Sequence, residues 1–367
     1  MDPKILRLAM GGAGAEAGSG LYVWGAGNYG ALGLGDTTNR SSPVILAGST
    51  WDKFAGGYNF AILTKTDGSI WATGGNGQGQ LGLGNTTNRS SPVQIGSLTN
   101  WSKIATGGRF CVSIKTDGSI WSWGANEIGQ LGLGDLTNRS SPVQIGSLTT
   151  WNKVAGGYRH ALAIKNDSTL WAWGDSLGVG DGTTTNKSSP VQIGSNAWSE
   201  ISGGGRFSVA VRTNGTLWSW GDNYYGKLGQ NSAVSYTTSP GQIGALTTWS
   251  KVACGYNHAA AIKTDGTLWT WGTGSFGQLG NSSTTNRSSP VQVGSLTNWS
   301  NIVCGNGFTI AIKTDNTIWS WGRNNANQLG LGDTTSRSSP VQIGSLSTWA
   351  SIPSGTTGAR FGMAKTQ

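Results

Sequence analysis

Short runs of alternating apolar and polar residues recur along the chain, and no window shows the longer period of an amphipathic helix. Between residues 101 and 150, the pattern predicts strands over 101–105, 110–115, 120–124 and 141–145. Gly107 and Gly108 bend the chain after the first strand, and Asp117-Gly118 favours a tight hairpin turn between the second and third. This stretch therefore predicts one antiparallel unit of four short strands.

The four-strand unit recurs in step with a Trp that begins its first strand. The steps between successive anchors are 50, 50, 47, 51, 50 and 50 residues. The anchors are Trp51, Trp101, Trp151, Trp198, Trp249, Trp299 and Trp349. A fixed period of this size indicates one structural unit per repeat, and four-stranded units arranged in a ring expose only short edges. The predicted fold class is therefore all-β, a seven-bladed β-propeller over residues 21–367.

The two ends of the repeat region carry parts of one blade. The chain stops at residues 364–367, where a hairpin turn and a third strand would follow. The missing strand matches residues 21–25, whose sequence LYVWG is similar to LWSWG at 217–221. We therefore expect residues 21–25 to pair with residues 359–365 and to close the ring by hydrogen bonds alone.

Residues 1–20 differ in composition from the repeats and are predicted to form a separate anchor peptide and linker. The linker is rich in Gly, Ala and Ser, which predicts flexibility. The short apolar run before it is interrupted by an arginine, so it is too weak for a secretory signal. The candidate anchor residues are Ile5, Leu6, Arg7, Leu8 and Met10.

Composition narrows the classes of function. The chain has 61 Gly, 19 Trp and only 11% charged residues, which suits a turn-rich fold with Trp in its core. The net charge of +9 comes from Lys and Arg at repeated positions, so it is spread around the ring, and nucleic-acid binding is not expected. No apolar stretch approaches the length of a membrane span. The three cysteines, Cys111, Cys254 and Cys304, lack metal-ligand spacing, and we expect buried thiols and no metal or cofactor.

A set of motifs repeats with the Trp anchors: W-x-W-G, then G-Q-L-G-x-G, then a Pro-Val step, then G-G-x-x-[HF]-x-x-A-I. Over residues 21–367 this set resembles the regulator of chromosome condensation repeat family, which implies a seven-bladed propeller. Kelch repeats share the period and the Gly pair, but the Gly-Gln-Leu-Gly blocks fit them poorly. The family includes a nucleotide exchange factor for a small GTPase, a plant ultraviolet-B photoreceptor and a secreted β-lactamase inhibitor, so the fold alone selects no function.

Two of these family functions depend on features that this sequence does not carry. The resemblance implies that the exchange factor of the family uses an extra wedge that protrudes from one blade. No repeat here exceeds its neighbours by more than about a residue, which leaves no room for such a wedge. The photoreceptor places its sensing Trp in a Gly-Trp-Arg-His-Thr motif. The matching slots here hold Tyr58, Gly108, Tyr158, Gly205, Tyr256 and Asn306.

Candidate catalytic groups are few. Gly-x-Gly-x-x-Gly occurs at residues 25–30 and 272–277, but strands and turns follow in place of the helix that a dinucleotide site needs. His160 and His258 fill slots that other repeats give to Phe, which predicts a packing role. No carboxylate pair or Ser-His-Asp set stands out, so we expect a protein that is not an enzyme.

Two sets of positions are candidate binding surfaces. The bends after the Gly pairs form the first, where a varied slot is flanked by repeated residues: Tyr58, Arg109, Tyr158, Arg159, Arg206 and Tyr256. Solvated loop tips would explain the same residues. The second is a cationic set three residues before each Pro, interrupted by Thr237: Arg40, Arg89, Arg139, Lys187, Arg287 and Arg337. Because a cation recurs at this position in nearly every blade, a structural role is favoured, with bonds to turn carbonyls or to Asp36, Asp135 and Asp333. The alternative is a site for anionic glycans or lipids.

The leading hypothesis for function is a non-enzymatic phage virion protein that decorates a capsid or tail or attaches to the host. Residues 1–20 would dock it on other virion proteins, and the Tyr and Arg positions would bind a host-surface glycan or receptor. One alternative is an intracellular regulator that binds a small GTPase or chromatin. A second alternative is a secreted bacterial inhibitor or adhesin.

Overall fold

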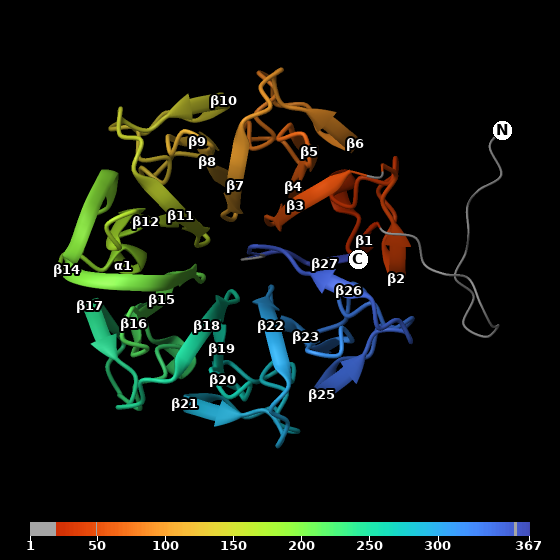
Figure 1. Cartoon of the computed structure of the whole chain (residues 1–367), viewed down its shortest axis with the longest axis vertical. Helices are drawn as coiled ribbons and strands as arrows, with labels where there is room; N and C mark the ends of the chain where they lie inside the picture. Colours follow the sequence, from red (N-terminus) through yellow and green to blue (C-terminus); the bar gives the residue numbers. More distant parts are fainter. Residues whose placement is uncertain (1–19, 49, 356–357) are drawn as a thin grey trace.

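Seven β-blades surround a central channel in the computed structural model, which describes residues 20–48, 50–355 and 358–367 (Figure 1). Each blade has four antiparallel strands, and a strand nearest the channel is followed by strands that lie progressively outward. The all-β, seven-bladed prediction is therefore confirmed.

The strands occupy equivalent positions in every blade. Those nearest the channel are β3 (Trp51–Gly56), β7 (Trp101–Thr106), β11 (Trp151–Gly156), the second half of β14 (Lys187–Gly203), β18 (Trp249–Cys254), β22 (Trp299–Cys304) and β26 (Trp349–Ser351). The second strands are β4 (Phe60–Lys65), β8 (Phe110–Lys115), β12 (His160–Lys165), β15 (Phe207–Arg212), β19 (His258–Lys263), β23 (Phe308–Lys313) and β27 (Phe361–Thr366).

The two outer positions complete each blade. The third strands are β5 (Ile70–Gly74), β9 (Ile120–Gly124), β13 (Thr169–Gly174), β16 (Leu217–Asp222), β20 (Leu268–Gly272), β24 (Ile318–Gly322) and β1 (Leu21–Gly25). The outermost strands are β6 (Arg89–Gln94), β10 (Arg139–Gln144), the first half of β14, β17 (Tyr236–Gln242), β21 (Arg287–Gln292), β25 (Arg337–Gln342) and β2 (Arg40–Ile45). Three short helices lie in loops: η1 (Asn28–Gly30), α1 (Ser176–Val179) and η2 (Tyr224–Gly226).

The strand β14 joins two blades without a break. Its 17 residues serve first as the outermost strand of one blade and then as the innermost strand of the next. Those two blades therefore form one seven-stranded sheet. The short step of 47 residues between Trp151 and Trp198 is the sequence signal of this shortened connection.

The ring closes as the sequence predicts, by pairing of the first strand with the last. β1 lies antiparallel to β27, with Leu21 opposite Lys365 and Gly25 opposite Phe361. The amide of Gly20 also donates a hydrogen bond to Thr366 Oγ1 at 3.0 Å. The pairing lies at the point of the ring where the red and blue ends of the chain meet (Figure 1).

Apolar side chains fill the spaces between neighbouring blades, and a buried Trp links six of the seven blades to the one before it. One such cluster joins Phe60 and Ile62 to Trp101 and Trp123 of the next blade. The indole of Trp123 donates to the carbonyl of Gln80 at 3.0 Å. The same bond is made by Trp24, Trp173, Trp220, Trp271 and Trp321. In the blade with no second Trp, the Thr73 hydroxyl donates to Gly30 O at 2.9 Å.

Many cations lie between two Trp rings. The ammonium of Lys115 lies 4.8 Å from the Trp101 ring centre and 3.6 Å from that of Trp121. Burial lowers the pKa of Lys115. The same arrangement holds Lys65, Lys165, Arg212, Lys263 and Lys313. Six of the 25 Lys and Arg residues are therefore committed to packing within the blades.

Two local expectations need correction. The outermost strand of the second blade, predicted over residues 141–145, begins at Arg139, so Pro142 lies inside it and not near its start. The strand tolerates Pro there because it is at the edge of the sheet and its register shifts between Arg139 and Val143.

The second correction concerns the last blade, which carries extra residues near the channel. Phe361 follows Trp349 by 12 positions, whereas Phe110 follows Trp101 by 9. The inner strand β26 ends at Ser351, and residues 352–355 turn into the channel. Ser354 N donates to Phe54 O at 3.1 Å, and Ser354 Oγ donates to Ile104 O at 2.8 Å. The repeats are therefore less uniform than their Trp spacing suggests.

Candidate functional site

Six of the seven inner strands run from their Trp anchor at one face of the propeller to a Gly bend at the other. We call the face that carries the bends the Tyr/Arg face. It contains all six binding positions predicted from the sequence: Tyr58, Arg109, Tyr158, Arg159, Arg206 and Tyr256. The opposite face, where the inner strands begin, is called the Trp face.

Three tyrosines meet at the centre of the Tyr/Arg face. The rings of Tyr58 and Tyr158 lie edge to face with centroids 6.5 Å apart, and those of Tyr158 and Tyr256 are 5.1 Å apart. Gly108 and Gly205 occupy the same slot in the blades between them. A Cβ on Gly108 would lie 2.6 Å from the Tyr158 ring. The absence of a side chain at Gly108 is therefore what leaves room for the Tyr158 ring.

Backbone hydrogen bonds hold these bends in place from blade to blade. Tyr58 N donates to Gly108 O, Gly108 N donates to Tyr158 O, and Gly205 N donates to Tyr256 O, each at 3.0 Å. All three tyrosines are half-buried. Burial raises the pKa of Tyr256, so its hydroxyl stays protonated at neutral pH. The cluster is a pre-organised aromatic surface with hydroxyl groups.

The arginines around the tyrosines differ in how far they are neutralised. Arg206 donates through Nε and Nη2 to the two carboxylate oxygens of Asp175, at 3.1 and 3.3 Å. Arg159 lies 3.9 Å from Glu127, and both side chains are about half exposed. Arg109 is exposed and has no ion pair within the described part of the chain. Arg109 and Arg159 are therefore the cations most available to a partner.

Exposed aromatics farther from the channel extend this face, and the sequence analysis missed them. The exposed fractions are 54% for Tyr29, 52% for Tyr225 and 42% for Phe276. Tyr29 lies beside Gly75, whose amide donates to Asn59 O next to Tyr58. The guanidinium of Arg323 lies 4.9 Å from the Phe276 ring centre. A large aromatic inside a Gly-rich loop, where other repeats carry smaller or polar residues, was the available signal.

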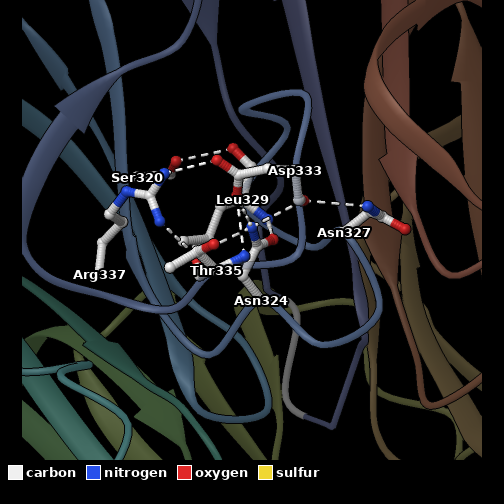
Figure 2. Close-up of polar contacts among 7 residues, drawn as sticks. All are labelled: Ser320, Asn324, Asn327, Leu329, Asp333, Thr335 and Arg337. Carbon is white, nitrogen blue, oxygen red and sulfur yellow. Dashed lines mark hydrogen bonds and ion pairs between the residues drawn. The ribbon is translucent and has the colours of Figure 1, made fainter.

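Four of the six cations before the Pro residues have the structural role that the sameness of the set suggested, whereas Arg89 and Arg287 form no ion pair within the described residues. Figure 2 shows Arg337 bound to Asp333 at 2.6 Å and donating to Thr335 O at 2.7 Å. Asn324 Nδ2 donates to the same carboxylate at 3.0 Å. Equivalent ion pairs join Arg40 to Asp36, Arg139 to Asp135 and Lys187 to Asp181. The hydrogen bond from Arg40 lowers the pKa of Asp36. These pairs support the structural alternative over an anion site.

The two histidines lie in the packing slot between blades. Both are fully buried, with Nε2 of His160 2.9 Å from Ser208 Oγ and Nε2 of His258 3.0 Å from Thr309 Oγ1. Burial lowers the pKa of His160 to about 4 and that of His258 to about 3. Both imidazoles are therefore neutral and enclosed at neutral pH.

Other candidate chemistry is sparse in the part of the chain that the structure describes. The Gly-x-Gly-x-x-Gly segment at 25–30 ends with the three-residue η1, and the one at 272–277 ends in a turn. Within residues 20–48, 50–355 and 358–367, no group of three His, Cys, Asp or Glu could hold a metal, and the cysteines are buried. No helix in those ranges is long and apolar enough to cross a membrane. The anchor candidates Ile5, Leu6, Arg7, Leu8 and Met10 lie outside the described residues.

The fold and this face define a seven-bladed propeller with an aromatic and cationic mouth. Comparison with known families gives the same class. The RCC1-like domain matches residues 150–367, and the Regulator of chromosome condensation (RCC1) repeat matches residues 19–63, 67–114 and 117–164. The chain belongs to the RCC1 repeat family. No curated protein sequence matches it.

Solved structures share the fold at low sequence identity. Human WBSCR16 superposes with a TM-score of 0.83 and 19% identity, over 95% of this chain and 99% of that one. Yeast RCC1 (Prp20) with bound Kap60 gives 0.82 and 18%, over 95% and 88%. Prp20p from Saccharomyces cerevisiae, described with its binding to Gsp1p and histones, gives 0.82 and 18%, over 95% and 91%. None of these three comparisons supports the virion hypothesis, which stays a prediction.

Proposed function

We propose that this chain is a non-catalytic binding protein whose protein partner contacts the Tyr/Arg face. The observation that carries the proposal is the cluster of Tyr58, Tyr158 and Tyr256 with available arginines beside it. Tyr and Arg dominate the binding energy of protein interfaces, because each combines a large apolar area with directed hydrogen bonds. A cluster already held by packing and backbone bonds loses little side-chain entropy on binding.

The charge of this face points to the chemistry of the partner. Arg109 and Arg159 are exposed, and Arg159 has only a long contact to a carboxylate. A partner that presents carboxylates beside apolar groups would pair with these guanidinium groups and cover the tyrosines. Histones are strongly basic, so this face suits an acidic partner surface better than a histone.

The proposed class is an intracellular regulator, and the first candidate partner is a small GTPase. The structurally similar yeast protein is described by its binding to Gsp1p and histones, which supports this class over virion display. The support is limited to the shared fold, because the identity is 18%. The residues of the Tyr/Arg face carry the rest of the proposal.

The experiment measures binding of the full chain to a panel of purified small GTPases, each loaded with GDP and each nucleotide-free. Arg109→Ala combined with Arg159→Ala removes two exposed charges, and Tyr158→Ala removes the central ring of the cluster. We expect each change to weaken binding about tenfold or more, as truncation of hot-spot residues does. The same variants are tested with core histones.

The control removes equal charge elsewhere. Arg89 and Arg287 begin outermost strands away from the channel. The variant with both replaced by Ala should bind like the wild-type chain. The proposal fails if no GTPase binds, or if binding to GTPases or histones is lost equally in the control and in the Arg109 and Arg159 variant.

A further inference from the structure

We propose a second site at the other end of the channel, where a small molecule bearing several phosphate groups binds a ring of lysines. This site goes beyond the proposed function and shares no residue with the Tyr/Arg face. The channel encloses a cavity of about 470 Å³ that is lined by the inner strands of all seven blades. Cavities of this size hold small ligands.

Lysines recur at one position of the strands that line the cavity. The third residue of the inner strands is Lys53, Lys103, Lys153 and Lys251 in four blades, and Glu200, Asn301 and Ser351 in the others. In the sequence successive lysines are 50, 50 and 98 residues apart, and each looks like an ordinary solvated position. Closure of the ring makes all of them line one cavity, and this juxtaposition is absent from any single repeat.

The carboxylates of the cavity neutralise only part of this charge. Asp52 pairs with Lys53 at 2.7 Å, and Glu200 pairs with Lys153. Lys251 Nζ donates to the neutral carbonyl of Ser300 at 2.5 Å. Within the described residues, Lys103 and Lys251 have no ion pair. Two cations without an ion pair therefore line the cavity at its open end.

The other end of the cavity is occupied, which gives the site a direction. Residues 352–355 lie in the channel, where Ser354 bonds to Phe54 and Ile104 and Gly355 O accepts from Gly56 N at 3.0 Å. Lys53, Lys103 and Lys251 are exposed. A ligand therefore approaches from the Trp face and meets the lysines first.

The charge pattern selects the ligand class. Lys103 and Lys251 come from inner strands that are not neighbours, β7 and β18, so one compact monovalent anion would satisfy only one of them. A chain or ring of phosphates presents several separated anionic oxygens and can accept hydrogen bonds from both ammonium groups and from polar neighbours such as Asn301. The site thus suits a polyphosphate, whether free or carried on a lipid headgroup.

The test is a calorimetric titration of the full chain with inorganic tripolyphosphate. We expect one site per chain, and affinity that falls as salt is raised because the contacts are ionic. Lys103→Met combined with Lys251→Met should weaken binding about tenfold or more, since each change removes a charge-assisted hydrogen bond. Vesicles with and without a bisphosphorylated inositol lipid form a second arm, which separates a soluble ligand from a headgroup.

Arg89→Met combined with Arg287→Met is the matched control, because it removes the same net charge from outermost strands. Retained binding in this variant and loss in the lysine variant supports the site. Absence of tripolyphosphate binding to the wild-type chain, or equal loss in both variants, overturns it. Melting temperatures of both variants confirm that they fold, and GTPase binding should be unchanged in the lysine variant.

Discussion

Tyr158 and Tyr256 meet edge to face with ring centroids 5.1 Å apart, although another blade lies between the two that carry them. The intervening blade contributes Gly205, whose amide donates to the carbonyl of Tyr256. A Cβ at this position would lie 2.4 Å from the carbonyl oxygen of Tyr256 and 3.6 Å from its ring. The glycine is therefore as much a part of the aromatic cluster as the tyrosines, and substitutions at these glycines test the cluster directly.

Gly108→Ala is expected to disturb the cluster between Tyr58 and Tyr158. The added methyl would lie 2.6 Å from the Tyr158 ring and 2.9 Å from its carbonyl oxygen, so the ring or the bend must move. We expect a loss of about 1–3 kcal/mol in the free energy of unfolding, as for other overpacked sites. Urea denaturation measures this loss, and partner binding should weaken with it.

Gly77→Ala is the matched control for this substitution. Gly77 is exposed in a loop, and a Cβ there meets no atom within 4 Å. Its free energy of unfolding should change by less than about 0.5 kcal/mol. Equal effects at positions 77 and 108 would show that the tyrosine cluster is not sterically tight.

The sequence predicts the parts of this fold that depend on neighbours along the chain. Period-two alternation and the Asp-Gly turns place strands such as Phe110–Lys115 correctly. Ring closure was predictable because the missing third strand of the last blade matches residues 21–25. The ion pair of Arg337 with Asp333 was one of two open alternatives, since a repeated cation could bond locally or bind a ligand.

Features that depend on the closed ring were harder to predict. The contact between Tyr58 and Tyr158 requires the width of the channel, which no single repeat encodes. The entry of Ser354 into the channel follows from extra residues after Trp349, and the spacing of 12 against 9 was the signal for it. Lysines such as Lys103 line a common cavity only after closure, so their position within one repeat does not indicate a binding site.

Trp123→Phe is expected to weaken the link between two blades. The substitution removes the 3.0 Å bond from the indole to Gln80 O and leaves a cavity, because Trp123 is fully buried. We expect a loss of about 2–4 kcal/mol in the free energy of unfolding.

Trp121→Phe gives the comparison within the same strand. Trp121 is half-buried, and its indole bonds locally to Ser119 Oγ at 2.9 Å. The free energy of unfolding of this variant should fall by about 1 kcal/mol, because a local hydrogen bond is lost and the cation–π contact with Lys115 is weakened. Urea denaturation of both variants measures the two losses in the free energy of unfolding. A smaller loss at position 123 than at position 121 would refute the role of Trp123 in linking two blades.

Acidification from pH 7 to pH 5 is expected to destabilise the protein through His160 and His258. Their folded pKa values, about 4 and about 3, lie below the value near 6.5 of an unfolded histidine. In this window the unfolded chain binds more protons, so stability is complete above about pH 6.5 and falls as the pH falls. The loss is about 1.4 kcal/mol per pH unit for each histidine, or roughly 4 kcal/mol for the pair at pH 5.

The variant with His160→Phe and His258→Phe should lose most of this pH dependence. Phe fits because the five other blades carry Phe60, Phe110, Phe207, Phe308 and Phe361 in this slot. Ser208 and Thr309 remain bonded, since their hydroxyls also donate to Gly178 O and Gln278 O. Aspartates such as Asp36 do not contribute in this window, because the hydrogen bond from Arg40 lowers the pKa of Asp36 further. Melting temperatures at pH 7 and pH 5 should differ for the wild-type chain and agree closely for the variant.

Removal of β1 is expected to open the ring, whereas removal of the residues before it is not. Deleting residues 1–25 removes four large buried side chains, Leu21, Tyr22, Val23 and Trp24, and exposes the strand β27 that they cover. The lost burial corresponds to about 5 kcal/mol or more, so the melting temperature should fall steeply or the chain should not fold. Deleting residues 1–19 keeps β1 and the bond from Gly20 to Thr366, and its melting temperature should match that of the full chain. Equal melting temperatures for the two deletions would mean that the pairing of Leu21–Gly25 with Phe361–Thr366 contributes nothing to holding the blades together.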